Sequence, residues 1–320
     1  MIEVSIIIVN YYLAKQIAKY VSLLFEQNVK TEVIIIDNSA DKVQQTLLSG
    51  LSQKYPLQLV FSPKNLGFGT AANLGVSKAK GKYVFFLNPD AYLPPNTIKK
   101  LLSFAQQKNA DAVGPKIFLD PAMTIPQPPF YPPTLKTVLL RFLLPKQFSR
   151  YWESYSLKFW QTNEPILTPF LSGAAFLIKK ELAQFDPRFF LYFEDADLFQ
   201  TLAKKNKKVY FYPQAKMVHF FDLCPSKQKE SFFIQSQQIF YQKHYPALAK
   251  CITWLNKHKR SYTKPGAIPL VKLLQQNWSG KTDLAFSPDF IPFVRARLDP
   301  KNLPCFVQRN LFRLWAKPVN

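Results

Sequence analysis

Three carboxylates stand in the otherwise aromatic and aliphatic stretch formed by residues 189–198. They are Glu194, Asp195 and Asp197. An ionised carboxylate in apolar surroundings is costly unless it binds a cation, pairs with a base or moves a proton, so we expect chemistry here. The same acids could instead only begin a helix at Glu194, because the N-terminal end of a helix favours negative charge. The stretch by itself leaves both interpretations open.

The elements that must position these acids form a regular alternation along the first half of the chain. Hydrophobic runs rich in β-branched and aromatic residues are followed by segments of helical periodicity. The alternation predicts an α/β fold with a mostly parallel sheet flanked by helices. Strands are predicted at residues 4–9, 32–36, 57–61 and 83–87, and helices at 13–25, 41–48, 70–79 and 96–108.

Ligands of such sheets bind beyond the carboxyl ends of the strands. The polar residues predicted to lie at this edge are Asn10, Asp37, Asn65 and Asp90. Each of them could be only a turn residue or a strand stop. Gly67 and Gly69 either permit a tight turn or let the backbone approach a phosphate. The first strand lacks a Gly-x-Gly-x-x-Gly turn, which argues against a dinucleotide enzyme.

Charge and composition narrow the classes of partner. The net charge of +22 indicates nucleic acid, an anionic membrane face or a phosphorylated substrate, and half of it lies beyond residue 220. The three cysteines are far apart, so neither a zinc site nor a disulfide framework is indicated. With no basic leader and no apolar run of about 18 residues, we expect a cytoplasmic protein without a membrane span. Peripheral attachment to the inner membrane face stays open.

Two segments depart from the alternation. Residues 120–169 form a predicted insertion whose proline run, 126–133, excludes regular helix or an inner strand. The apolar segment behind it, 138–144, either lies on a membrane or acceptor surface or packs on the domain as an ordinary loop. Sheet character resumes at 171–178. We divide the chain into a domain of residues 1–245 and a basic, aromatic-containing, mainly helical extension of residues 246–320.

Six motifs together carry a resemblance to a known family. They are SIIIVNYY (5–12), IIDNSA (35–40), NLGFGTAANLG (65–75), LNPDA (87–91), LSGA (171–174) and FDPRFFLYFEDADL (185–198). Their order and spacing resemble those of family 2 glycosyltransferases, most closely the bacterial rhamnosyltransferase-like branch. The resemblance covers about residues 3 to 245. It implies a GT-A fold and an inverting transfer of a sugar from a nucleoside diphosphate donor to a hydroxyl of a glycan or lipid-linked acceptor.

The resemblance also implies a cofactor and a setting. A divalent cation, Mg²⁺ or Mn²⁺, would balance the diphosphate charge. Asp90 would anchor it, and His219 would supply a further metal or diphosphate contact unless it is only a core histidine. Asn88 stands where family members often have another aspartate, so metal dependence is left open. The resemblance places the reaction in envelope polysaccharide biosynthesis, with dTDP-rhamnose as the first donor to consider and a UDP-hexose as the next.

Roles for the remaining residues follow from the same resemblance. Asp195 would be the general base, Glu194 would orient the acceptor or its loop, and Asp37 and Asn10 would contact the nucleotide. The full donor-binding set is Asn10, Asp37, Asn65, Gly67, Asn73, Asn88, Asp90, Ser172 and Gly173. A non-catalytic nucleotide-sugar-binding protein is one alternative. A nucleic-acid-binding protein is another, although acids at the strand ends would repel phosphates, so no nucleic acid partner is expected.

Overall fold

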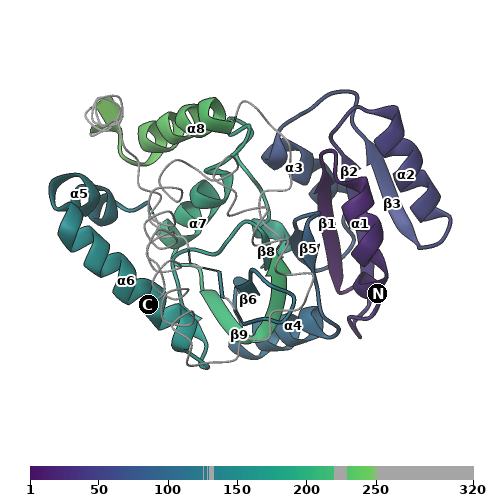
Figure 1. Cartoon of the computed structure of the whole chain (residues 1–320), viewed down its shortest axis with the longest axis horizontal. Helices are drawn as coiled ribbons and strands as arrows, with labels where there is room; N and C mark the ends of the chain where they lie inside the picture. Colours follow the sequence, from purple (N-terminus) through teal and green to yellow (C-terminus); the bar gives the residue numbers. More distant parts are fainter. Residues whose placement is uncertain (125, 128, 130–132, 220–228, 248, 251–320) are drawn as a thin grey trace, which may run out of the picture.

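The computed structural model describes residues 1–250 except 125, 128, 130–132, 220–228 and 248. The predicted extension of residues 246–320 therefore lies almost wholly outside the described residues. Helices cover both faces of a central sheet, and the helix pair α5–α6 lies at the opposite end of the long axis from α2 and β3 (Figure 1). None of the helices in the described part of the chain is long and apolar enough to cross a membrane.

The N-terminal half of the sheet is parallel, as predicted. Its strands are ordered β3-β2-β1-β4. β1 is buried along its whole length, which explains its uninterrupted β-branched sequence. The bounds are Val4–Asn10 for β1, Thr31–Asp37 for β2, Leu57–Phe61 for β3 and Tyr83–Leu87 for β4.

The helices of this half match their predicted positions closely. α2 begins where Asp41 accepts a hydrogen bond from the Gln44 N–H, the usual arrangement of a helix N-cap. The predicted helix at 13–25 is α-helical only over its first part and continues as the 3₁₀-helix η1. The bounds are Ala14–Tyr20 for α1, Val21–Phe25 for η1, Lys42–Ser52 for α2, Phe68–Lys78 for α3 and Thr97–Lys108 for α4.

Beyond β4 the sheet becomes mixed, which the sequence did not indicate. β8 (Ala175–Lys179) runs antiparallel to β4, so its first residue pairs with the last residue of β4. β6 (Ala112–Phe118) is antiparallel to β8 and parallel to β9 (Val209–His219). The short strands β5 (Ala91–Tyr92) and β7 (Ile166–Leu167) are both antiparallel to β9. The antiparallel course of β8 carries the preceding residues, 171–174, to the carboxyl edge of β4.

The hydrophobic core occupies both faces of the sheet. Ile6 and Ile8 pack in one cluster with residues of α1, η1 and α4, whereas Ile7 and Val9 pack in the other with residues of α3. Alternate residues of a strand point to opposite faces, so a strand buried on both faces needs apolar residues at every position. The second cluster also contains residues of α7 (Glu194–Lys204) and α8 (Lys229–His244). A short 3₁₀-helix, η2 (Lys180–Leu182), follows β8.

The insertion contains two helices that the proline run obscured. α5 (Leu135–Leu143) is capped by Thr134, whose hydroxyl accepts from the Thr137 N–H, and α6 (Pro145–Gln161) begins with proline. The apolar segment at 138–144 is therefore mostly helical rather than an ordinary loop, and α5 packs on α6.

Candidate active site

The buried carboxylate of Asp37 lies where β1 and β2 end, and one of its oxygens is hydrogen-bonded. Asn10 and Asp37 are paired in register, and the Asn10 amide donates to Asp37 Oδ1 over 2.8 Å. The Ser39 hydroxyl donates to the same oxygen over 2.7 Å. Asp37 is fully buried, and its Oδ2 has no hydrogen-bond partner among the described residues. A buried acceptor without a partner is unfavourable, so this oxygen is suited to accept a hydrogen bond from a hydroxyl or amide group of a ligand.

Asn65 shapes the loop between β3 and α3. The Asn38 amide donates to Asn65 Oδ1 over 2.9 Å, and the Gly67 N–H donates to the same oxygen over 2.9 Å. Asn38 Oδ1 in turn accepts from the Leu66 N–H over 2.8 Å. Sequence reasoning missed Asn38, whose position after Asp37 in the IIDNSA motif was the available signal. The carboxamide of Asn65 is thus used inside the loop, and its contact with a donor stays a prediction.

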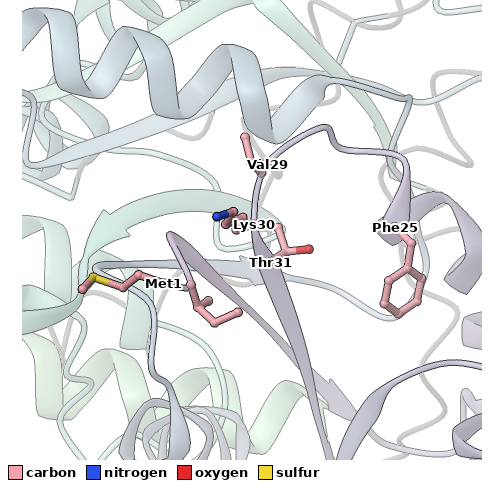
Figure 2. A pocket seen from close by; sticks show the side chains of 6 residues that line it. Met1, Phe25, Val29, Lys30 and Thr31 are labelled. Atoms are coloured by element: carbon pink, nitrogen blue, oxygen red, sulfur yellow. The ribbon is translucent and has the colours of Figure 1, made fainter.

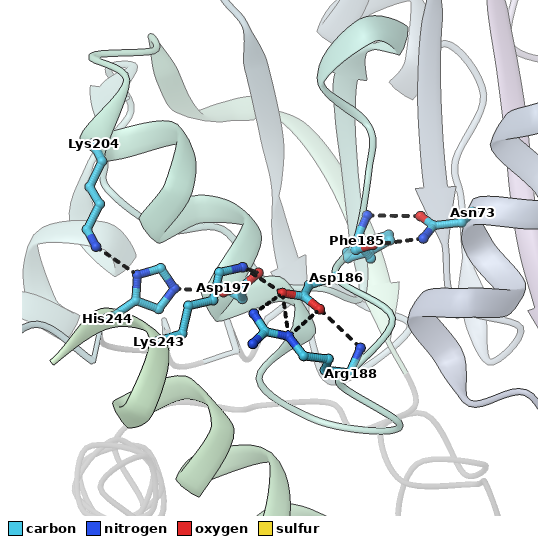
Figure 3. Close-up of polar contacts among 8 residues, drawn as sticks. All are labelled: Asn73, Phe185, Asp186, Arg188, Asp197, Lys204, Lys243 and His244. Atoms are coloured by element: carbon cyan, nitrogen blue, oxygen red, sulfur yellow. Dashed lines mark hydrogen bonds and ion pairs between the residues drawn. The ribbon is translucent and has the colours of Figure 1, made fainter. Parts of the chain in front are cut away.

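Gly67 and Asn73 join this loop and α3 to the acid-bearing segment. Gly67 has φ +77°, and a Cβ there would lie 2.3 Å from the Phe190 carbonyl oxygen, so only glycine fits. The Phe68 N–H donates to that oxygen over 2.9 Å. The Asn73 amide donates to the Phe185 carbonyl over 2.8 Å and accepts from the Phe185 N–H over 2.9 Å (Figure 3). These contacts are structural, and donor binding by either residue stays a prediction.

Asp90 and His219 meet because β5 pairs with β9. Asp90 Oδ1 lies 3.1 Å from His219 Nε2, and both side chains are buried. The Asn88 amide nitrogen lies 3.2 Å from the same Nε2, and Gln127 Oε1 lies 3.4 Å from Nδ1. Asp90 and Asn88 thus lie beside Nε2 and Gln127 lies beside Nδ1, which orients the imidazole ring. His219 is therefore part of the edge where Asp37 and Asp90 lie, and Gln127 was missed by the sequence reasoning.

The Asp90–His219 pair suits a divalent cation that the substrate also ligates. A carboxylate oxygen and a neutral imidazole nitrogen are both acceptable to Mn²⁺, whereas Mg²⁺ favours oxygen. No group of three or more His, Cys, Asp and Glu side chains in the described residues could hold a metal ion. Two protein ligands leave the remaining positions to diphosphate oxygens and water, which is how such cations commonly bind nucleotides. The residues present fit that arrangement.

Asp195 is held against the segment that precedes β8. Its Oδ2 accepts from the Gly173 N–H over 3.1 Å, and its Oδ1 accepts from the Ala196 N–H over 2.7 Å. A Cβ on Gly173 would lie 2.8 Å from Oδ2, so the glycine allows this close approach. The backbone rather than a flexible side chain therefore fixes where this carboxylate lies.

The same segment connects Asp195 to the Asp90 cluster. The hydroxyl of Ser172, directly before Gly173, accepts from the Ala174 N–H over 3.3 Å, which closes a tight turn. The Ala174 carbonyl accepts from the Asn88 N–H over 2.9 Å. Residues 172–174 thus form a bonded bridge between the two groups of acids that the sequence singled out. Direct donor contacts by Ser172 and Gly173 stay predictions.

The pKa values of Glu194 and Asp195 are both raised by burial, but neighbouring groups shift them in opposite directions. Burial raises the pKa of Glu194, and the charge of Asp195 raises it further. Burial also raises the pKa of Asp195, but the N–H groups of Ala196 and Gly173 oppose that shift. Glu194 Oε2 has no hydrogen-bond partner in the described part of the chain. Paired acids with separated pKa values are typical of sites that move protons.

The backbone that leads into α7 is strained and braced by α8. Tyr192 and Phe193 have φ values of 68° and 63°, which cost non-glycine residues about 1–3 kcal/mol each. The Ser236 hydroxyl donates to the Leu191 carbonyl over 2.8 Å. The Phe193 ring packs against that of Phe240 with centroids 5.5 Å apart. Contacts from α8 therefore hold the acids in a conformation that the loop alone would disfavour.

An ionic network locks α8 onto α7 (Figure 3). Asp197 Oδ2 lies 2.8 Å from Lys243 Nζ, and its Oδ1 lies 2.7 Å from His244 Nε2. Lys243 Nζ also lies 2.8 Å from Asp186 Oδ2. Hydrogen bonds from Arg188 and from Lys243 hold the pKa of the Asp186 carboxyl well below its usual range. Asp197 is thus more than an acid in the first turn of a helix. The network was not predicted, because nothing in the sequence shows that α8 returns to α7.

A pocket at the other edge of the sheet takes no part in this site. It is lined by Met1, Ile2, Phe25, Val29, Lys30 and Thr31 (Figure 2). These residues lie at or near the amino ends of β1 and β2, whereas Asn10 and Asp37 end those strands. The candidate site is therefore the carboxyl edge.

Solved structures with the same fold are glycosyltransferases. A mannosyltransferase from Pyrobaculum calidifontis in complex with GDP-Man and Mn²⁺ has a TM-score of 0.52 and 16% identity, covering 99% of this chain and 88% of that one. GalNAc-T7 with UDP, GalNAc and Mn²⁺ has a TM-score of 0.58 and 15% identity, covering 92% and 58%. At this identity the likeness shows the fold, and it confirms the predicted GT-A architecture.

Sequence comparison identifies the family. Residues 5–184, more than half of the chain, match the profile of Glycosyl transferase family 2. The chain belongs to this family, as its motifs predicted. A relative from Mycobacterium tuberculosis, N-acetylglucosaminyl-diphospho-decaprenol L-rhamnosyltransferase, is 28% identical over 207 residues, which are 58% of this chain and 66% of the relative. The chain thus spans just under two thirds of that relative's length.

Proposed function

We propose that this glycosyltransferase moves a sugar, with inversion, from a nucleoside diphosphate donor to a hydroxyl of a glycan or lipid-linked acceptor in envelope polysaccharide biosynthesis. The observation that carries the proposal is the bonded bridge of residues 172–174 between the Asp90–His219 pair and Asp195. It joins groups suited to a diphosphate with a group suited to accept a proton. The 28% identical rhamnosyltransferase makes dTDP-rhamnose the first donor to test and a UDP-hexose the second.

On the donor side, polar groups at the strand ends bind and orient the nucleotide. Asp37 Oδ2 accepts a hydrogen bond from the base or ribose, and the Asn10 amide holds the carboxylate in place by donating to Oδ1. Asp90 and His219 would hold a divalent cation, with Asn88 beside the imidazole. Such a cation supplies counter-charge for the diphosphate as negative charge grows on the leaving group.

On the acceptor side, Asp195 removes the proton that the attacking hydroxyl must lose. The hydroxyl oxygen forms its bond to the anomeric carbon while the bond from that carbon to the diphosphate oxygen breaks, and the proton passes to the Asp195 carboxylate. A raised pKa brings this carboxylate closer to the working pH, which improves a general base. Glu194, whose pKa burial and Asp195 both raise, stays protonated more readily and orients the acceptor or the loop.

The same proposal places the enzyme at a membrane. A lipid-linked acceptor lies in a bilayer, and the net charge of +22 favours an anionic surface such as the cytoplasmic face of the cell membrane. The Mycobacterium tuberculosis relative is named for transfer to a diphospho-decaprenol, which supports a lipid-linked acceptor. The division into a domain of residues 1–245 and a basic extension of residues 246–320 belongs to this proposal.

A thermal-shift screen of nucleoside diphosphate sugars, each with and without Mn²⁺ or Mg²⁺, tests the donor. A ligand that binds only the folded state raises the melting temperature, so dTDP-rhamnose or a UDP-hexose should do so, and more strongly with the cation. Free Mn²⁺ alone and dTMP serve as controls for metal and nucleotide effects. The screen then moves to product detection with a diphospholipid acceptor. Binding without any transfer would favour a non-catalytic nucleotide-sugar-binding protein.

A further inference from the structure

We infer that helix α5 docks on an anionic lipid bilayer through a row of exposed leucines, an inference that rests on the lipid-linked acceptor proposed above. The row consists of Leu135, Leu139 and Leu143, which are 39%, 40% and 69% exposed. Residues spaced by four lie on one face of a helix, so the three side chains form a continuous apolar strip. Leu144, directly after the helix, extends the strip and is 46% exposed.

The leucine row is not needed for packing. Thr137, on the opposite side of α5, is buried, and the helix packs on α6. Within α6, Phe148 and Phe159 are buried and supply apolar contacts for this part of the molecule. Large apolar side chains kept in water along one helix face are typical of a surface that binds another body.

Charge selects an anionic bilayer as that body. The sequence of α5 and α6 carries five basic residues and one acid, which are Lys136, Arg141, Lys146, Arg150, Lys158 and Glu153. Lys136 and Arg150 are exposed. A helix with an apolar strip and basic neighbours is suited to the interface of a membrane, where anionic lipid attracts basic residues near the surface.

Hydrogen bonds connect this helix pair to the active site. At the end of α6, the Trp160 carbonyl accepts from Lys116 Nζ over 2.6 Å, and the Trp160 indole N–H donates to the Gln127 carbonyl over 3.1 Å. The Gln127 side chain lies beside His219. A bilayer that holds α5 would therefore fix the orientation of the metal-side residues relative to an acceptor in the same bilayer.

Co-sedimentation of the full chain with vesicles tests the inference without any nucleotide sugar. Vesicles of phosphatidylglycerol and phosphatidylcholine are compared with vesicles of phosphatidylcholine alone. The test variant is Leu139→Gln/Leu143→Gln. The control, Val43→Gln, removes an apolar side chain that is 63% exposed on α2, at the other end of the molecule (Figure 1). Partition onto anionic vesicles should fall by about tenfold or more in the test variant and stay unchanged in the control.

Three results would overturn the inference. They are equal vesicle binding by the test variant and the wild type, equal binding of the wild type to neutral and anionic vesicles, and light scattering that shows a wild-type dimer converted to monomer by the leucine changes. Lys136→Gln should weaken binding at low salt and have less effect at high salt. Sugar transfer to a water-soluble acceptor should be the same in the test and control variants. If the wild type transfers no sugar, the proposed function fails, whereas the vesicle comparison still reports on the leucine row.

Discussion

On the proposed donor side, side chains of neighbouring strands bond to Asp37 and lie beside Asp90, whereas on the proposed acceptor side backbone N–H groups hold Asp195. The second acceptor-side acid, Glu194, has a carboxylate oxygen with no hydrogen-bond partner among the described residues. Asp37 also has such an oxygen, but Asn10 and Ser39 satisfy the other one. The donor side therefore orients fixed charges toward a ligand, and the acceptor side keeps its carboxylates poorly solvated.

The difference shows how the carboxyl edge of one sheet can serve both diphosphate binding and proton removal. A diphosphate needs permanent polar partners and a counter-ion, which side-chain networks provide. A proton acceptor needs a pKa moved toward the working pH, which burial provides. Changes on the two sides should accordingly affect different measurements, and five substitutions test that separation.

The largest effect is expected from Asp195→Asn. Asparagine keeps the size and one of the two oxygens that accept from the Gly173 and Ala196 N–H groups, but it cannot take a proton. Turnover should fall by about 10²- to 10⁴-fold while donor affinity stays near that of the wild type, because general-base assistance has about that magnitude. Single-turnover kinetics and donor titration measure the two quantities. Near wild-type turnover would assign the base to another group, and joint loss of donor binding and stability would favour the helix-start interpretation.

Asp90→Asn should act on donor binding, and Asp37→Asn is its matched partner on the same edge. Removal of the Asp90 carboxylate should weaken donor binding in Mn²⁺ by about 10- to 100-fold and leave the metal-free affinity nearly unchanged. Asp37→Asn should weaken binding to a similar degree with and without the cation. Calorimetric titrations under both conditions separate the variants. Identical metal dependence in both would remove Asp90 from the cation site.

Lys243→Met should act through the brace between α8 and α7. Removing the ammonium leaves Asp186 and Asp197 without their shared partner, which should lower the free energy of unfolding by about 2–3 kcal/mol. Turnover should fall with little change in donor affinity, because the strained loop before Glu194 loses its support. Urea unfolding and kinetics measure both, and Lys99→Met on the exposed face of α4 is the control. A loss of donor affinity equal to the loss of turnover would contradict the separation of the two sides.

Glu194→Gln should change how stability depends on pH, with the smallest effect of the five. The folded-state pKa of Glu194 is raised above its unfolded value of about 4.3, so the folded state binds the proton more tightly. Stability is therefore highest below that unfolded value and is lost as pH rises through the folded-state pKa. Glutamine should remove much of that loss and make the variant more stable than the wild type at alkaline pH by about 1–2 kcal/mol. Urea unfolding across a pH series checks this, and parallel curves for the two proteins would show that Glu194 is not the group responsible.

Local features of the fold were predictable from the sequence. The buried strand Val4–Asn10 and the helix cap at Asp41 follow from patterns within a few residues. The antiparallel course of β8 and the pairing of Ala91 with His219 depend on contacts between distant segments. The family resemblance pointed to His219, but only the strand pairing brings it to Asp90. α5 was missed because the nearby prolines outweighed the capping signal of Thr134.

Besides the bridge of residues 172–174, the two sides are joined at the contact between Gly67 and Phe190. Since there is no room for a Cβ and the Phe68 N–H is bonded across the gap, the loop after β3 and the loop before Glu194 cannot shift independently. The consequence concerns the order of substrate addition. We expect a nucleotide that fixes the conformation of the loop after β3 to fix that of the loop before Glu194 as well. The donor should therefore bind before the acceptor. Initial-velocity and product-inhibition patterns would reveal a compulsory order of substrate binding. A random order of binding would show that the contact does not couple the two loops.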